Sequence, residues 1–146
     1  MKSILIVEDD ITYGMMLKTW LGKKGFQVAS VSSIARAQKH LETEGADLIL
    51  SDLRLPDGDG IDLLRWMRKE GMMQPFIIMT DYAEVHTAVE SMKLGSIDYI
   101  PKKLIEDKLV PLIRTIQKER QAGLNRIPVF AREGSAFQKI MHRIKL

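Results

Sequence analysis

Five short apolar runs, separated by longer stretches with helical spacing, constrain the fold of this chain more than any other feature. The runs lie at residues 4–7, 27–31, 47–51, 76–80 and 97–100. Short continuous apolar runs are typical of strands that are covered on both faces of a parallel sheet. Apolar residues at helical spacing follow each run, at residues 11–23, 34–44, 61–69, 85–94 and 107–120. Strict alternation of strand and helix predicts an α/β fold, in which right-handed crossovers place helices on both faces of a parallel sheet.

The composition excludes several classes of function. The chain has no Cys, which rules out disulfides, thiolate metal sites and Cys nucleophiles. The first apolar run is ended by Glu8 too soon for a signal peptide, and no apolar stretch approaches the length of a membrane span. We therefore expect a cytoplasmic protein with no membrane partner.

The charge is unevenly distributed along the chain. Residues 1–100 hold 11 basic and 15 acidic side chains, whereas residues 101–146 hold 11 basic and 4 acidic ones. The basic residues of the tail are spread along helical patterns and form no continuous block, so direct binding of nucleic acid by this chain is not expected. A new amphipathic stretch opens at Ser135 and reaches Leu146 without a helix stop signal, which predicts the front piece of a longer protein.

Polar residues with complementary chemistry follow four of the expected strands. They are Glu8, Asp9 and Asp10 after the first strand, Asp52 after the third, Thr80 after the fourth and Lys102 after the fifth. The carboxyl ends of strands in such sheets are where ligands bind. Crowded carboxylates repel one another unless a divalent cation neutralises them, and Mg²⁺ is the natural candidate because it takes one or two carboxylates and keeps several waters.

These residue types suit phosphoryl transfer to an aspartate. A carboxylate beside Mg²⁺ can attack phosphorus, while Lys102 supplies positive charge and Thr80 a hydrogen bond to the phosphoryl oxygens. Taken singly, each residue has a plainer interpretation, since Asp after a strand often forms a turn or caps a helix. Asp10 directly precedes an expected helix and is interpreted as such a cap. The joint placement of the other residues favours the functional interpretation.

Four segments together resemble the receiver domains of two-component response regulators, over residues 1–121. They are residues 3–10 (SILIVEDD), 52–60 (DLRLPDGDG), 77–80 (IIMT) and 98–102 (DYIPK). The resemblance implies a flavodoxin-like, doubly wound (βα)5 fold with a five-stranded parallel sheet in the order 2-1-3-4-5. It also implies a phosphoacceptor switch, not a conventional enzyme, that takes its phosphoryl group from a sensor histidine kinase.

The same resemblance assigns roles to individual residues. Asp52 would be phosphorylated, and Mg²⁺ would be held by Glu8, Asp9, Asp52 and the backbone carbonyl of Arg54. Thr80 and Lys102 would bind the phosphoryl group, and Tyr99 would change rotamer as a switch.

Two positions depart from the family's pattern. In the family, the lysine is usually followed by a proline, and the peptide bond between the two is cis. Here Lys103 stands in place of that proline, and a cis bond before a residue other than proline costs about 2.5 to 4 kcal/mol. The loop that holds Lys102 is therefore expected to be trans or strained. Asp81 stands where a small residue is usual, and its charge could slow phosphorylation or dephosphorylation.

Residues 80–99 are similar to receivers of NtrC-type regulators, and residues 133–141 (EGSAFQKIM) resemble the start of the AAA+ ATPase domain of sigma-54-dependent activators. The expected organisation is a receiver at 1–121, a linker at 122–132 and a truncated AAA+ domain at 133–146. DNA and RNA polymerase would then be contacted only through domains missing from this chain. The helix expected at 85–94, the strand at 97–100 and the helix at 107–120 would form a switching face and a homodimer surface.

Two other functions compete with this hypothesis. A phosphatase of the haloacid dehalogenase type also uses a nucleophilic Asp with Mg²⁺, but it needs a second Asp two residues later, where this chain has Arg54. The stronger alternative is a receiver-like docking module that signals without phosphorylation, because Asp81 and Lys103 both lie near the expected site. Reactivity with a phosphoryl donor in the presence of Mg²⁺ separates the two.

Overall fold

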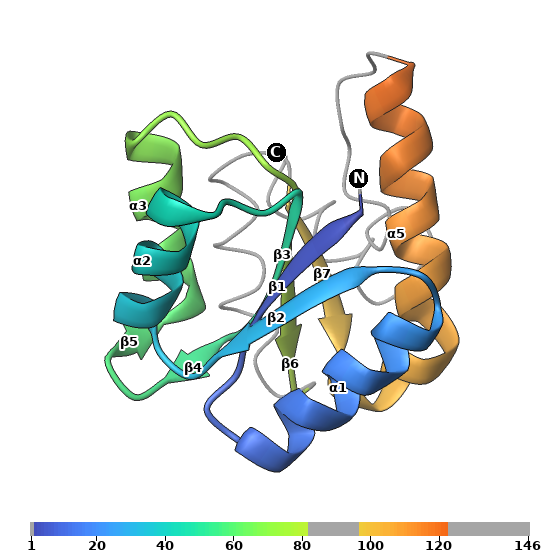
Figure 1. The fold of residues 1–146 in the computed structure, drawn as a ribbon, viewed down its shortest axis with the longest axis horizontal. Coiled ribbons are helices and arrows are strands. Elements are labelled where there is room, and N and C mark those ends of the chain that lie inside the picture. The colour runs from blue at the N-terminus through green and yellow to red at the C-terminus, as the bar shows by residue number, and fades with distance from the viewer. Residues whose placement is uncertain (1, 82–96, 123–146) are drawn as a thin grey trace, which may run out of the picture. The chain divides into compact units, whose positions relative to one another are not determined.

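The computed structural model describes residues 2–81 and 97–122 (Figure 1). The chain divides into two compact units, residues 1–77 and residues 78–146, and each is described by itself. The first unit contains β1 (Ser3–Val7), α1 (Ile11–Lys23), β2 (Gln27–Val31), α2 (Ile34–Thr43), β3 (Leu48–Asp52), β4 (Arg54–Leu55), β5 (Gly58–Asp59) and α3 (Gly60–Lys69). The strand β6 (Phe76–Thr80) leads into the second unit, which contains β7 (Ile97–Pro101), the 3₁₀ helix η2 (Lys102–Leu104) and α5 (Ile105–Gln121).

The main sheet has five parallel strands in the order β2-β1-β3-β6-β7. Since β4 and β5 form a separate two-stranded hairpin, β6 and β7 are the fourth and fifth strands of the main sheet in chain order. The predicted α/β fold and the order 2-1-3-4-5 are therefore confirmed. In the first unit, α2 and α3 cover one face of the sheet and α1 covers the other (Figure 1).

The strands of the first unit are buried as continuous apolar runs. In β1, residues 4–7 are buried, and in the neighbouring β3, residues 48–50 are completely inaccessible. The two strands are in parallel register, with Ile4 beside Leu48 and Val7 beside Ser51. Strands covered on both faces need apolar side chains in both directions, which explains why the runs do not alternate with polar residues.

Caps and glycines set the ends of the helices, and the cap at Asp10 is the one that the sequence predicted. The backbone N–H of Tyr13 donates to Asp10 Oδ1 at 3.0 Å, which confirms Asp10 as the N-cap of α1. The glycines after α1, α2 and α3 have positive φ angles: Gly25 98°, Gly45 72° and Gly71 79°. Gly95, which follows the helix expected at 85–94, lies outside the described residues.

The strand β3 begins one residue later than the run predicted. The side chain of Asp47 accepts hydrogen bonds from the backbone N–H of Lys2 at 3.0 Å and of Ser3 at 3.1 Å. These bonds lower the pKa of the Asp47 carboxyl, the Ser3 N–H most strongly. Asp47 therefore fastens the start of β1 instead of extending β3.

In the second unit, α5 begins at Ile105, two residues earlier than predicted, and follows the 3₁₀ turn directly. Its apolar stripe is buried and consists of Leu109, Leu112, Ile113 and Ile116. The helix predicted at 85–94, most of the linker and the proposed AAA+ segment at 133–146 lie outside the described residues. Among residues 2–81 and 97–122, no helix has the length and apolarity needed to cross a bilayer.

Candidate metal centre

Three carboxylates meet at the carboxyl ends of β1 and β3. Val7 pairs with Ser51 in the sheet, so Glu8 and Asp52 follow directly from neighbouring positions. The backbone N–H of Glu8 also donates to the carbonyl of Val31 at 2.9 Å, which keeps Glu8 in line with the sheet. One carboxylate oxygen from each of Glu8, Asp9 and Asp52 lies within 4.8 Å of the others. The structure thus brings together the three acidic residues that the sequence singled out.

The three carboxylates differ in exposure. Glu8 is 2% exposed, Asp52 is half-buried and Asp9 is exposed. Glu8 lies close to Gly14 of α1, and Gly14 is buried where the helix packs on the sheet. A Cβ atom at Gly14 would lie 2.9 Å from Ser30 Oγ and 3.8 Å from the Cβ of Glu8. The acidic cluster is therefore closed on the side of α1 and open to solvent at Asp9.

The donor set fits Mg²⁺. An octahedral Mg²⁺ ion holds its oxygen ligands at about 2.0 to 2.1 Å, so ligands on opposite sides of the ion lie about 4.2 Å apart. Three ligands of one ion include at most one opposite pair, and neighbouring ligands lie about 3.0 Å apart, so oxygens within 4.8 Å of one another need to move by up to about 2 Å. Because all three donors are carboxylate oxygens, the chemistry of the cluster also suits a hard cation.

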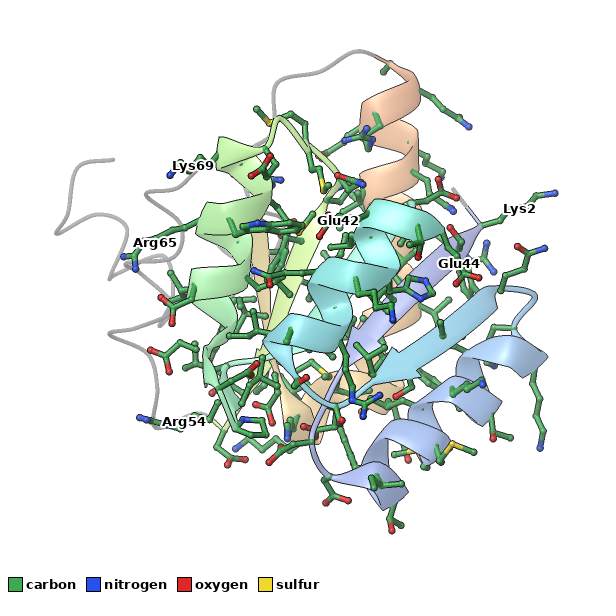
Figure 2. The ribbon with its side chains drawn as sticks, turned by 60° about the vertical axis from the view of Figure 1, so that its left-hand side comes forward. Lys2, Glu42, Glu44, Arg54, Arg65 and Lys69 are labelled. Carbon is green, nitrogen blue, oxygen red and sulfur yellow. The ribbon has the colours of Figure 1, made fainter. Side chains whose placement is uncertain are left out.

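The loop after Asp52 contains a short hairpin. Arg54 pairs with Asp59, and Leu55 with Gly58, so that β4 and β5 form a small antiparallel hairpin. The backbone N–H of Arg54 makes a long contact of 3.4 Å to Asp52 Oδ1. The Arg54 side chain is exposed and extends outward from the fold (Figure 2). The contact of Arg54 with Asp52 is thus made by its backbone N–H, and the carbonyl ligand that the resemblance implies remains a prediction.

Thr80 ends β6, as the sequence predicted, and belongs to the second unit. It is 2% exposed, and its hydroxyl donates to the backbone carbonyl of Asp81 at 3.2 Å. The side chain of Asp81 is exposed. A hydroxyl that bonds only to the neighbouring backbone can rotate to a new acceptor at small cost.

Lys102 and Tyr99 also belong to the second unit. Lys102 directly follows β7 as the first residue of η2 and is half-buried. No peptide bond is cis within 2–81 and 97–122, so the bond between Lys102 and Lys103 is trans, one of the two outcomes expected from the missing proline. Tyr99 is 3% exposed, and burial raises the pKa of its phenol. The convergence of Thr80 and Lys102 on the three carboxylates remains a prediction.

Sequence reasoning missed two residues that shape this site. Gly14 was not distinguished from other helical residues, although only its missing side chain lets α1 approach Ser30. Asp57 was not singled out, although its carboxylate accepts a hydrogen bond at the start of α2 across 23 residues of sequence. For Gly14, the available signal was a glycine inside an amphipathic helix. For Asp57, no local signal exists.

Comparison with known proteins identifies the family to which this chain belongs. Residues 4–114 match the model of the response regulator receiver domain, and the chain therefore belongs to that family. Its receiver is NtrC-like, as the sequence predicted.

Named relatives agree with this placement. The chain is 38% identical over 106 residues to the transcriptional regulatory protein ZraR of Klebsiella oxytoca, a match that covers 73% of this chain and 24% of ZraR. It is 39% identical over 107 residues to the regulatory protein AtoC of Escherichia coli K12, covering 73% of this chain and 23% of AtoC. The chain thus spans about a quarter of the length of these relatives. Among solved structures, the non-phosphorylated HemR receiver domain of Leptospira biflexa is similar with a TM-score of 0.70 and 33% identity, over 80% of this chain and 94% of that one.

Proposed function

We propose that this chain is a phosphorylation switch in which Asp52 accepts a phosphoryl group from a sensor histidine kinase with the help of Mg²⁺. The observation that carries the proposal is the cluster of Glu8, Asp9 and Asp52 at the carboxyl ends of adjacent parallel strands, in a chain of the receiver family. The half-buried position of Asp52 leaves its carboxylate accessible to a donor.

The chemical step needs a nucleophile and a balanced charge. An Asp52 carboxylate oxygen attacks the phosphorus of a phosphohistidine, a P–O bond forms, the P–N bond breaks, and the leaving imidazole nitrogen keeps the electron pair and takes a proton from solvent. Lys102 offsets negative charge on the phosphoryl oxygens, and the Thr80 hydroxyl donates a hydrogen bond to one of them. The Thr80 hydroxyl, which can rotate to a new acceptor, is compatible with its role.

Mg²⁺ would be held by carboxylate oxygens of Glu8, Asp9 and Asp52 together with the Arg54 carbonyl. The ion supplies positive charge that offsets the repulsion between the carboxylates and the incoming phosphoryl group. Glu8, being buried, has the least freedom to move away from the ion, and Asp9 is the ligand that solvent reaches most easily.

The output of the switch would lie in a longer protein. Residues 1–121 would be the receiver, residues 122–132 a linker and residues 133–146 the start of an AAA+ domain of a sigma-54-dependent activator. The EGSAFQKIM motif and the low coverage of ZraR and AtoC support this organisation. Phosphorylation would move Tyr99 and change the face formed by residues 85–94, β7 and α5, which would also be the homodimer surface. Since the apolar stripe of α5 is buried, that surface would use the polar side of the helix.

A docking module that works without phosphorylation is the second candidate. It is favoured by the exposed Asp81, which directly follows Thr80 in the sequence, and by the missing proline at Lys103. A negative charge at Asp81 would repel an incoming phosphoryl group.

Intact-mass measurement after incubation with acetyl phosphate separates the two candidates. A switch is expected to gain one phosphoryl group in Mg²⁺ and none when the metal is chelated. A folded wild type that binds Mg²⁺ but gains no phosphoryl group would contradict the switch and favour docking. An Asp81→Ala variant that becomes reactive would then identify Asp81 as the barrier.

A further inference from the structure

One side chain fastens the hairpin that carries Arg54 to a neighbouring helix. Asp57 lies at the turn between β4 and β5, and its two carboxylate oxygens accept hydrogen bonds from the first two residues of α2. Oδ1 accepts from the Ile34 N–H at 2.9 Å, and Oδ2 accepts from the Ala35 N–H at 3.0 Å. The first N–H groups of a helix have no partner within the helix, so these donors are available to an outside carboxylate.

The remaining hairpin has little freedom once Asp57 is held. The backbone N–H of Gly60 donates to the Leu53 carbonyl at 2.7 Å and closes the base of the hairpin. At Gly58, φ is +145°, and a Cβ atom would lie 2.9 Å from Asp62 Oδ2 and 3.0 Å from Ile34 Cδ1. The hairpin is thus packed against α3 on one side and the start of α2 on the other.

Capping of α2 does not by itself account for Asp57. Ser33 already caps this helix, since its side chain accepts a hydrogen bond from the Arg36 N–H at 3.2 Å. The two bonds to Asp57 come from other N–H groups and connect segments 23 residues apart. They also lower the pKa of the Asp57 carboxyl, the Ile34 N–H most strongly.

We infer that Asp57 is a positioning residue that holds the Arg54 carbonyl in place as a ligand of the metal, an inference that rests on the proposed Mg²⁺ site. Without this clamp the hairpin can move away from α2, and Mg²⁺ binding must then also order the hairpin. Once Mg²⁺ is bound, a variant without the Asp57 carboxylate has the same metal ligands as wild type. The variant therefore loses Mg²⁺ affinity and keeps its reactivity at saturating Mg²⁺.

The test compares wild type, Asp57→Ala, Asp57→Asn and Ser33→Ala as full 146-residue chains. The rate of phosphorylation by acetyl phosphate is measured against Mg²⁺ concentration, and Mg²⁺ binding is measured separately by calorimetry. For Asp57→Ala we expect the half-saturating Mg²⁺ concentration to rise roughly tenfold, with the rate at saturating Mg²⁺ unchanged. Asp57→Asn keeps one acceptor oxygen and should lie between Asp57→Ala and wild type.

Ser33→Ala is the matched control, because it removes a cap of the same helix without touching the hairpin. It should lower stability by about 1 kcal/mol and leave the Mg²⁺ dependence unchanged. Equal Mg²⁺ dependence in Asp57→Ala and Ser33→Ala would overturn the positioning role and leave Asp57 a helix cap. If Asp57→Ala does not fold, Asp57→Asn replaces it, and a wild-type Mg²⁺ affinity in Asp57→Asn would also overturn the positioning role. Absence of Mg²⁺ binding by wild type would instead overturn the metal site, and with it the proposed function.

Discussion

Replacing Asp52 by Asn should make the metal-free protein more stable. One carboxylate oxygen of Asp52 lies within 4.8 Å of a carboxylate oxygen of Glu8 and of one of Asp9. At that separation one pair of charges repels by about 0.9 kcal/mol in water and about 3.5 kcal/mol at an effective dielectric constant of 20. Asn removes two such repulsions and keeps the shape of the side chain. Because solvent screens the exposed Asp9, we expect a net gain of about 1 to 2 kcal/mol.

Mg²⁺ should reduce this difference in stability. At a concentration ten times its Kd, an ion that binds only the folded state stabilises it by about 1.4 kcal/mol. Wild type should show this gain, whereas Asp52→Asn, which lacks one of the ligands, should gain less. Urea unfolding of both proteins, with chelator and with Mg²⁺, measures the four free energies of unfolding.

Asp10→Asn is the control for the change in net charge. Asp10 follows Asp9 in sequence but caps α1, and Asn caps helices about as well as Asp. The reasoning fails if Asp52→Asn is no more stable than Asp10→Asn without metal. It also fails if Mg²⁺ stabilises Asp52→Asn as much as wild type.

Two further predictions concern the packing and the pH dependence of the fold. Gly14→Ala should destabilise wild type, because its Cβ atom would lie 2.9 Å from Ser30 Oγ. In a Ser30→Ala background the same substitution should stabilise the fold by about 1 kcal/mol, because Ala favours a helix more than Gly does. Unfolding of wild type, both single variants and the double variant tests this prediction, and a loss of stability in both backgrounds would contradict it. Asp47 has a pKa below the ordinary value of 3.8 in the folded state, so its contribution to stability is present above about pH 4 and is lost as the pH falls through the lowered pKa. Asp47→Asn should therefore be less stable at neutral pH and should lose less stability on acidification; parallel stability curves between pH 5 and pH 3 would contradict this.

The fold and the acidic cluster were accessible from the sequence because both follow from strand patterning. Continuous apolar runs located the strands, and the residues directly after them fell at one edge of the sheet by the geometry of parallel pairing. Glu8, Asp9 and Asp52 therefore came together in the structure as the pattern predicted.

The contacts that fasten this edge were not accessible, because they join distant segments through single side chains. The Asp57 carboxylate reaches α2 across 23 residues, and Asp47 reaches Ser3 across 44. In each case the local sequence is equally compatible with a turn residue or a strand residue that faces solvent. The space beside Gly14 likewise depends on Ser30 of another element. Such features require the positions of both partners, which hydrophobic periodicity does not supply.

The most direct test of the central claim is to locate the phosphoryl group on the chain. Wild type would be treated with acetyl phosphate and Mg²⁺, reduced with borohydride to convert an aspartyl phosphate to homoserine, and analysed by peptide sequencing in a mass spectrometer. Asp57 and Asp59 lie in the same segment and serve as internal controls, since one is bound to α2 and the other is paired in the hairpin. The account predicts homoserine at position 52 alone, dependent on Mg²⁺. Conversion at another position, or none in a folded protein that binds Mg²⁺, would contradict it.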